Sequence, residues 1–241
     1  MKTLSTFVIA AAGLLAVQAW AQPAQAQDAS VQVIHGINGT DLGFDEALPV
    51  DIAVDGACAL PGVSFRDIAR DVALPAGSYE IAVSLADAGT PCGGLLVVNS
   101  RVELAVFENA TIIAHLNQGV SPTLTKVSNN VSPLGAHDTR LAVVHAAVAP
   151  PVDVLARPKR GSFRDSLFID GLANGEQSFP SDAPAGSYQV RISPDGSVRS
   201  VAQVDVRLDP QVAYTAFAVG SLANGTFELI LLDQSAAGSS S

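Results

Sequence analysis

Short runs of apolar residues, or of alternating apolar and polar residues, recur along most of the chain. Such runs, rich in Val, Ile and Thr and separated by Gly, Pro, Asn and Asp, predict β-strands joined by turns. The predicted strands cover residues 31–34, 50–54, 79–83, 101–107, 111–116 and 124–127, then 141–144, 152–155, 188–192, 201–208, 213–219 and 227–232. Residues 64–70 and 162–168 predict a helical turn or a further short strand. This strand density is typical of an antiparallel sandwich with Greek-key connections.

Three motifs occur twice in the same order. They are Val31-Gln-Val-Ile-His35, Pro49-Val-Asp51 and Pro75-Ala-Gly-Ser-Tyr79, which return as Leu141-Ala-Val-Val-His145, Pro151-Val-Asp153 and Pro184-Ala-Gly-Ser-Tyr188. Ordered recurrence of this kind indicates that one folding unit is present in two copies. We therefore predict an all-β protein of two tandem antiparallel, immunoglobulin-like β-sandwiches.

The domain limits follow from the composition between the repeated motifs. The first sandwich is predicted over 28–127 and the second over 139–234. Residues 128–138 are polar, contain Pro and Gly and lack periodicity, as a linker does. Residues 235–241 are rich in Ser and predict a flexible tail.

The first 26 residues have the pattern of a secretory signal peptide. Lys2 is followed by an apolar run over 7–17, and small residues then offer cleavage sites after Ala21 or Ala26. The run is too short to span a bilayer comfortably, although an N-terminal membrane anchor is the alternative. No later stretch predicts a membrane span, so the mature chain is expected to be exported, into the periplasm or outside the cell.

The chain is acidic, with 23 Asp and Glu against 13 Lys and Arg and a formal net charge of −10. Its three lysines leave no basic patch in the sequence pattern. Nucleic acid and anionic lipid surfaces are therefore disfavoured as partners. The single tryptophan, Trp20, lies in the predicted signal peptide, which also argues against sugar binding by a Trp platform.

Cys58 and Cys92 are the only cysteines. In an exported chain, two isolated cysteines are most simply explained by one disulfide. A redox pair is the alternative, but such pairs are usually spaced as Cys-x-x-Cys. Neither cysteine has a counterpart in the second copy, so we predict a local structural bridge.

These motifs, together with Ala213-Tyr-Thr-Ala-Phe-Ala-Val-Gly220, resemble the bacterial family catalogued as domain of unknown function 4397. The resemblance covers nearly all of the predicted mature chain, as two copies. It departs in the first copy, where residues 36–48 lengthen a connection and the cysteine pair is added. The family implies export and a β-sandwich, but no activity and no catalytic residue.

Two groups of polar residues are candidate ligands. His35 with Asp51, and His145 with Asp153, could each form an acid–base couple or part of a metal site. Because a metal site needs three or four ligands, we favour a structural histidine bonded to a carboxylate or a backbone carbonyl. The acidic loop containing Asp41, Asp45 and Glu46 could bind calcium, although it lacks the EF-hand order.

The repeated Gly-Ser-Tyr segments predict turns rather than nucleophiles, because neither serine lies in a Gly-x-Ser-x-Gly motif. Positive φ is expected at Gly77 and Gly186, and core or corner positions are expected for Tyr79 and Tyr188.

The sequence thus favours a non-catalytic, exported module of the cell envelope or the extracellular space, with an envelope protein or a cell-wall polymer as partner. The alternative is a protein that binds a small ligand or calcium through loops at one end of the sandwiches. No other cofactor is expected, and an enzyme is disfavoured.

Overall fold

The computed structural model describes residues 28–234. The predicted signal peptide and the predicted tail lie outside the described residues. Within 28–234 the chain is all-β, with two short 3-10 turns, η1 (Gly39–Leu42) and η2 (Phe163–Asp165). No helix in this range has the length and apolar character needed to cross a membrane.

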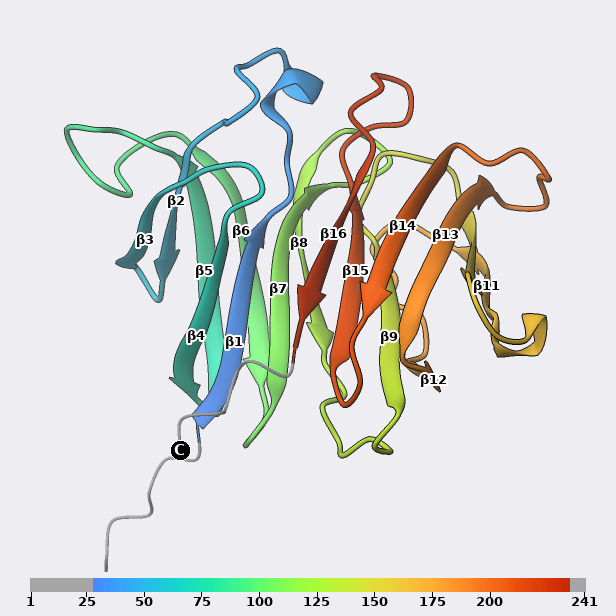
Figure 1. Ribbon diagram of the computed structural model, residues 1–241. Helices are drawn as coiled ribbons and strands as arrows, with labels where there is room; N and C mark the ends of the chain where they lie inside the picture. The colour runs from blue at the N-terminus through green and yellow to red at the C-terminus, as the bar shows by residue number, and fades with distance from the viewer. Residues whose placement is uncertain (1–27, 235–241) are drawn as a thin grey trace, which may run out of the picture.

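The first sandwich is built from two four-stranded sheets (Figure 1). One has the order β4-β1-β7-β8 and the other the order β3-β2-β5-β6. The strands are β1 (Asp28–His35), β2 (Val50–Val54), β3 (Ala57–Val63), β4 (Ile68–Pro75), β5 (Gly77–Leu85), β6 (Leu96–Leu104), β7 (Asn109–Leu116) and β8 (Pro122–Ser128).

The second sandwich repeats this plan, with sheet orders β12-β9-β15-β16 and β11-β10-β13-β14. Its strands are β9 (Asp138–His145), β10 (Val152–Pro158), β11 (Leu167–Leu172), β12 (Ser181–Pro184), β13 (Gly186–Pro194), β14 (Ala202–Leu208), β15 (Ala213–Val219) and β16 (Glu228–Asp233). Two tandem sandwiches were predicted from the repeated motifs, and this prediction is confirmed. Their immunoglobulin-like character stays a prediction.

One strand pair in each sandwich runs parallel. β1 pairs with β7 so that His35 lies opposite Ala114, and β9 pairs with β15 so that His145 lies opposite Ala218. The remaining ladders are antiparallel, so the sandwiches are antiparallel apart from these two pairs. The equivalent register places the two repeated histidines at equivalent points of the two copies.

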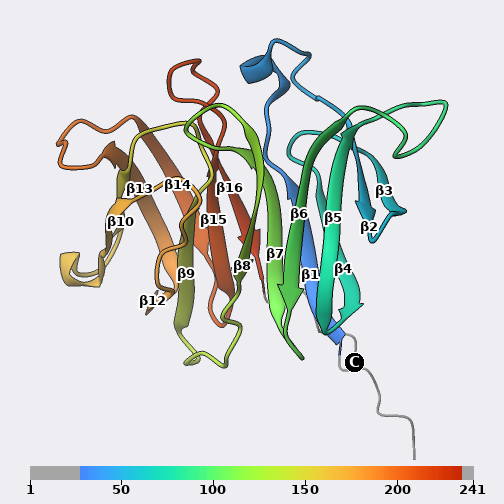
Figure 2. The same ribbon diagram turned by 180° about the vertical axis from the view of Figure 1, so that it is seen from behind.

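The two sandwiches pack against each other through one sheet of each, which gives four layers of sheet (Figures 1 and 2). An apolar cluster at this contact, which we call the seam, draws on β1, β7, β8 and the β3–β4 connection of the first copy and on β9, β15, β16 and the residue after β9 of the second. The cluster is Ile34, Phe65, Ile113, Val127, Val144, Ala146, Phe217, Val219 and Leu232. Strands β7 and β9 are therefore covered on both faces, and every residue after the first of each strand is buried.

Several strand limits differ from the sequence prediction. β3 and β12 were missed, because Ala57–Val63 contains Ala, Pro and Gly in place of β-branched residues and Ser181–Pro184 is very short. β6 begins at Leu96 and ends at Leu104, whereas residues 105–107 form a turn in which Phe107 has a φ of 56°.

The prediction of a positive φ holds for one of the two repeated glycines. Gly186 has a φ of 159°, whereas Gly77 has no positive φ. Both glycines start strands, β5 and β13, instead of closing a left-handed turn.

Candidate functional site

The repeated histidines end strands β1 and β9 and are fully buried, with no exposed surface. His35 Nε2 lies 2.8 Å from the Leu48 carbonyl oxygen, and His145 Nε2 lies 3.1 Å from the Pro150 carbonyl oxygen. In each copy the backbone N–H two residues further on points at Nδ1, at 3.4 Å from Ile37 and 3.3 Å from Ala147. This arrangement assigns the proton to Nε2 and leaves Nδ1 as an acceptor.

Both histidines are held neutral by their surroundings. Burial lowers the pKa of His35 and of His145, against smaller raising effects of the carbonyl contacts. A second proton at Nδ1 would also face a backbone N–H donor instead of an acceptor. These rings brace the connections after β1 and β9, and neither one bonds the Asp of its own Pro-Val-Asp motif.

The repeated aspartates anchor backbone at the edge of each sandwich. Asp51 accepts hydrogen bonds from the Gly62 amide at 2.8 Å and the Cys92 amide at 2.7 Å. Asp153 accepts from Gly171 at 2.9 Å and Gly196 at 3.1 Å. Each carboxylate therefore ties the neighbouring edge strand to a connection in its own copy.

The glycine partner of each aspartate lies in a β-bulge. The ladder shifts register between Val50 and Ile52, and likewise between Val152 and Val154. Gly62 has a φ of 68° and Gly171 a φ of 57°, a backbone region in which glycine is favoured. The sequence signal for this anchor is therefore a Pro-Val-Asp motif followed by a glycine in the next strand.

Burial acts to raise the pKa of Asp51, but the amides of Cys92, Gly62 and Asp87 outweigh it, so the pKa is lowered. Asp51 is only 2% exposed and stays ionised through these backbone bonds. A general base must reach its substrate, and Asp51 is buried with each oxygen bonded to a backbone amide.

The repeated tyrosines are corner residues, as the sequence predicts. Tyr79 donates its hydroxyl hydrogen to the Pro75 carbonyl oxygen at 2.7 Å, and Tyr188 donates to Pro184 at 2.6 Å. Tyr188 is 1% exposed, whereas Tyr79 is half-buried. Burial raises the pKa of Tyr188, and the charge of Asp165 adds to the effect.

The acidic loop of the first copy lies at one end of the seam. Asp41 accepts hydrogen bonds from the Asn224 amide at 2.9 Å and the Thr226 hydroxyl at 2.8 Å, both in the second copy. Glu46 pairs with Arg66 at 3.0 Å, and Arg66 also reaches Glu228 of the second copy in a two-pronged contact. Asp45 is exposed. Asp41 and Arg66 therefore join the two sandwiches, and Glu46 pairs with Arg66 within the first copy.

A third buried histidine, His115, was missed by the sequence analysis. It lies on β7, and its ring nitrogens contact the Leu116 carbonyl oxygen at 3.1 Å and the Thr125 hydroxyl at 2.8 Å. Burial lowers its pKa, and the nearness of the His145 ring adds to the lowering, because two neighbouring imidazoles would repel each other if both were charged. His115 has no repeated counterpart, since Val219 occupies the equivalent register position, so the motif search could not find it.

The predicted disulfide is confirmed. Cys58 on β3 and Cys92 in the β5–β6 connection are bonded, with 5.7 Å between their Cα atoms. The bond joins the edge strand β3 to a loop, on the same side of the sandwich where Asp51 holds both segments.

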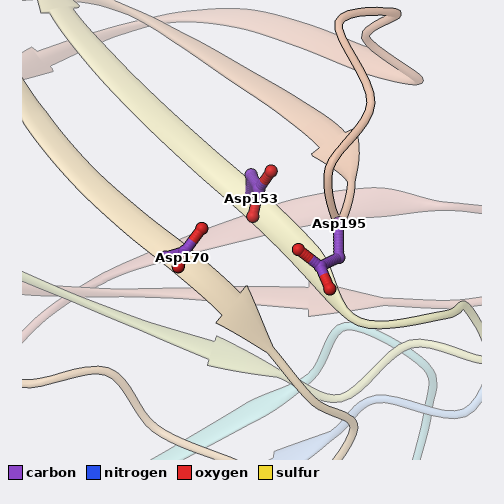
Figure 3. Close-up of side chains that lie close together, drawn as sticks. All are labelled: Asp153, Asp170 and Asp195. Carbon is purple, nitrogen blue, oxygen red and sulfur yellow. The ribbon is translucent and has the colours of Figure 1, made fainter.

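At the equivalent place in the second copy, three carboxylates meet (Figure 3). Asp153 on β10, Asp170 on β11 and Asp195 in the β13–β14 connection each bring an oxygen within 4.8 Å of the others. Asp153 is half-buried and the other two are exposed. Among the described residues, this group has the geometry to share one cation through oxygen ligands.

Comparison with known proteins places the chain in a family. The model of the domain of unknown function (DUF4397) matches residues 29–155 and again 149–241. The chain therefore belongs to this family and carries two copies of its domain. The comparison with curated proteins gave no match.

Solved structures share only a distant likeness. The Bacillus anthracis TIE protein is 11% identical, with a TM-score of 0.25, and the match covers 80% of this chain and 33% of that protein. The chain thus spans about a third of the length of that protein. CBMbc, of family CBM26, from Eubacterium rectale Amy13K, solved in complex with maltoheptaose, is 8% identical over 84% of this chain and 96% of its own, with a TM-score of 0.24.

A candidate cell-adhesion protein of Bacteroides ovatus is 9% identical over 85% of this chain and 95% of its own, with a TM-score of 0.26. At these scores the likenesses carry no inference about function.

Proposed function

We propose that this chain is an exported, non-catalytic β-sandwich protein that acts as an interaction or structural module of the cell envelope or the extracellular space. Its partner is an envelope protein or a cell-wall polymer. The protein works through its surfaces and loops, and the cores of its two sandwiches hold those surfaces in place.

This proposal rests on one observation: the polar side chains that recur in both copies form hydrogen bonds with backbone groups. His35 and His145 bond to carbonyl groups, Asp51 and Asp153 accept two amides each, and the two tyrosines bond to carbonyls. An acid–base or nucleophilic role needs a polar atom that is free to meet a substrate. The recurrence is thus explained by a shared folding constraint.

Two further features support an exported module. A disulfide persists in oxidising compartments and is rare in the cytosol. The N-terminal pattern at 1–26 predicts a signal peptide, and a protein with this address would meet wall and envelope material. The seam joins the two copies through buried apolar residues, which suits a rigid body that presents several loops at once.

The test is a co-sedimentation of the full mature chain with purified cell-wall sacculi and with washed envelope membranes. The expected result is that the protein sediments with one of these fractions and that His145→Ala alters stability without abolishing that binding. A chain that stays in the supernatant with every fraction would contradict the proposal. So would a hydrolytic or redox activity that disappears with His145→Ala while the fold is kept.

A second candidate function is calcium binding at Asp153, Asp170 and Asp195, because these carboxylates converge from three segments. Calcium takes six to eight oxygen ligands, so water and backbone carbonyls would complete the shell. The ion would hold β11 to the β13–β14 connection, where the first copy has its disulfide between β3 and the β5–β6 connection.

Thermal unfolding with and without CaCl2 tests this candidate. A site that binds only the folded chain raises the unfolding midpoint as the calcium concentration rises. The rise should vanish in Asp170→Asn/Asp195→Asn and persist in the matched control Asp45→Asn, which alters an exposed carboxylate of the first copy. An unfolding midpoint that does not change with the calcium concentration would rule out this candidate.

A further inference from the structure

The second copy has an insertion that the first copy lacks. Strands β2 and β3 are joined by the two residues Asp55 and Gly56, whereas β10 and β11 are joined by residues 159–166, which include η2. This connection is the short coil beside β11 in Figure 1. It is held by a capping box, in which the side chains of Ser162 and Asp165 bond to each other's backbone segments.

The insertion forms one wall of a cavity of about 560 Å³ at the end of the second sandwich. The opposite wall is the repeated Pro-Ala-Gly-Ser-Tyr segment, at 184–188, together with Arg207 of β14. The volume lies in the range of ligand pockets, about 300–1,000 Å³. The repeated motif thus gains, in the second copy alone, a facing wall built by the insertion.

The cavity is basic although the chain is acidic. Lys159, Arg160 and Arg207 line it against one carboxylate, Asp165. Arg157 and Arg164 lie in the same stretch of chain, and the guanidinium of Arg157 stacks on the Phe163 ring at 4.6 Å. The three lysines of the chain gave no sign of this cluster, because arginines make up most of it.

The cations around the cavity are available to a ligand. Lys159 pairs with Asp205 at 2.5 Å and Arg207 with Asp209 at 3.0 Å, but in both pairs the side chains are about half exposed or more. Exposed pairs of this kind contribute little and exchange readily. Arg160 has no hydrogen bond or ion pair with any other residue in the range 28–234. It is the cation best placed to receive an outside anion.

We propose that this cavity binds an acidic glycan, through a carboxylate group held by Arg160 and its neighbouring cations. A guanidinium can donate two parallel N–H hydrogen bonds to one carboxylate. The serine hydroxyl and the backbone groups of the opposite wall suit sugar hydroxyls. Recognition by charge needs no tryptophan platform. The proposal rests on the proposed function, and it names the class of wall or matrix polymer that the module would meet.

Titration calorimetry of the full mature chain tests the proposal with three probes: trigalacturonate, the neutral maltotriose and inorganic phosphate. We expect trigalacturonate to bind, and we expect its affinity to fall as the NaCl concentration rises, because the attraction is between charges. Maltotriose should not bind, and phosphate should bind more weakly than trigalacturonate. Arg160→Ala should raise the dissociation constant for trigalacturonate about tenfold, because one charge-assisted contact is lost.

The matched control is Arg101→Ala, which removes an exposed arginine of β6 in the first copy. It should leave trigalacturonate binding unchanged, and both variants should unfold at the wild-type temperature. Equal binding of maltotriose, tighter binding of phosphate, an equal loss with Arg101→Ala or no binding at all would each overturn the proposal. Wall or envelope co-sedimentation that survives Arg160→Ala would show that only this site fails, while the broader proposed function stands.

Discussion

The two sandwiches use different chemistry at the same place in the fold. In the first, a disulfide ties β3 to the β5–β6 connection beside the buried Asp51. In the second, two exposed carboxylates stand at the equivalent position beside Asp153. The backbone framework, with its bulge and its aspartate anchor, is the same in both. The shared backbone framework therefore sets the fold, and the side chains around it can differ: a disulfide in the first copy and carboxylates in the second.

A second difference lies at the opposite end of the two copies. The tight turn at Asp55 and Gly56 is replaced in the second copy by the longer connection over 159–166, which creates the basic cavity. One copy is thus compact and covalently closed, while the other is open and charged. Both proposed binding sites, the carboxylate group and the basic cavity, therefore lie in the second copy.

The largest expected effect concerns the seam. Phe217 on β15 has no exposed surface and packs with residues of both copies. Phe217→Ala should cost about 3–5 kcal/mol of the free energy of unfolding, because it leaves a cavity between the sandwiches. Urea unfolding followed by circular dichroism measures this loss. Phe179→Ala, at a side chain that is 93% exposed, is the control and should change little.

The same experiment asks whether the copies are independent. If the seam couples them, the wild type unfolds in one transition and Phe217→Ala separates it into two. Two transitions already present in the wild type would mean that each sandwich has its own stability, and the contrast between them could then be measured copy by copy.

The next effect is that of the disulfide. Its closed loop, with a sequence separation of 34, should stabilise the first copy by about 3–4 kcal/mol on the chain-entropy model. Cys58→Ser/Cys92→Ser should lower the free energy of unfolding by this amount. Hydrogen exchange should become faster in β2, β3 and β5 and remain nearly unchanged in β10, β11 and β13. Equal acceleration in both copies would show that the bridge acts on the whole body.

The dependence of stability on pH comes next. Burial lowers the pKa of His35, His115 and His145, so the unfolded chain takes up their protons first. The stability is therefore fully present above the unfolded histidine pKa of about 6.5 and is lost as the pH falls below it, until the folded pKa values are reached.

Each histidine contributes up to about 1.4 kcal/mol per pH unit in this window. Urea unfolding at several values between about pH 7 and about pH 5 measures the slope. Since two of these rings belong to the first copy, that copy should lose more protection from hydrogen exchange. A flat profile would mean that protons reach the rings in the folded chain.

The smallest effect compares the two corner tyrosines directly. Tyr79→Phe and Tyr188→Phe each remove one hydroxyl that bonds to a proline carbonyl. Tyr188→Phe should lower the free energy of unfolding by about 1–3 kcal/mol, because the carbonyl of Pro184 then has neither the hydroxyl nor water as a hydrogen-bond donor. Tyr79, which is half-buried, should lose about 0.5–1.5 kcal/mol. Equal losses would show that burial does not distinguish the two corners.

Much of the fold could be predicted from the sequence, because strand periodicity and the repeated motifs are local signals. The strands at 50–54, 111–116 and 213–219 all appear within a few residues of their predicted limits. β3 was missed because it owes its place to pairing with β2 on one side and to the disulfide, and its own residues have low β-propensity. Strand limits depend on such partners more than on composition.

The candidate site was predicted less well. The two histidine–aspartate pairs do not form, because each member finds backbone partners closer by. The calcium site was predicted in the loop with Asp41, where three acidic residues are close together in the sequence. The carboxylates that converge in the structure come instead from residues 153, 170 and 195. Residues this far apart share a site only after the strands have paired.

The sequence by itself determined the duplication, the all-β class and the partnership of the two cysteines, because repetition, periodicity and residue counts are written in chain order. Only the tertiary structure decided that the copies share a buried seam and that arginines gather at one cavity. Those features depend on which faces of distant strands meet, and that choice is made by the packing of the whole apolar surface.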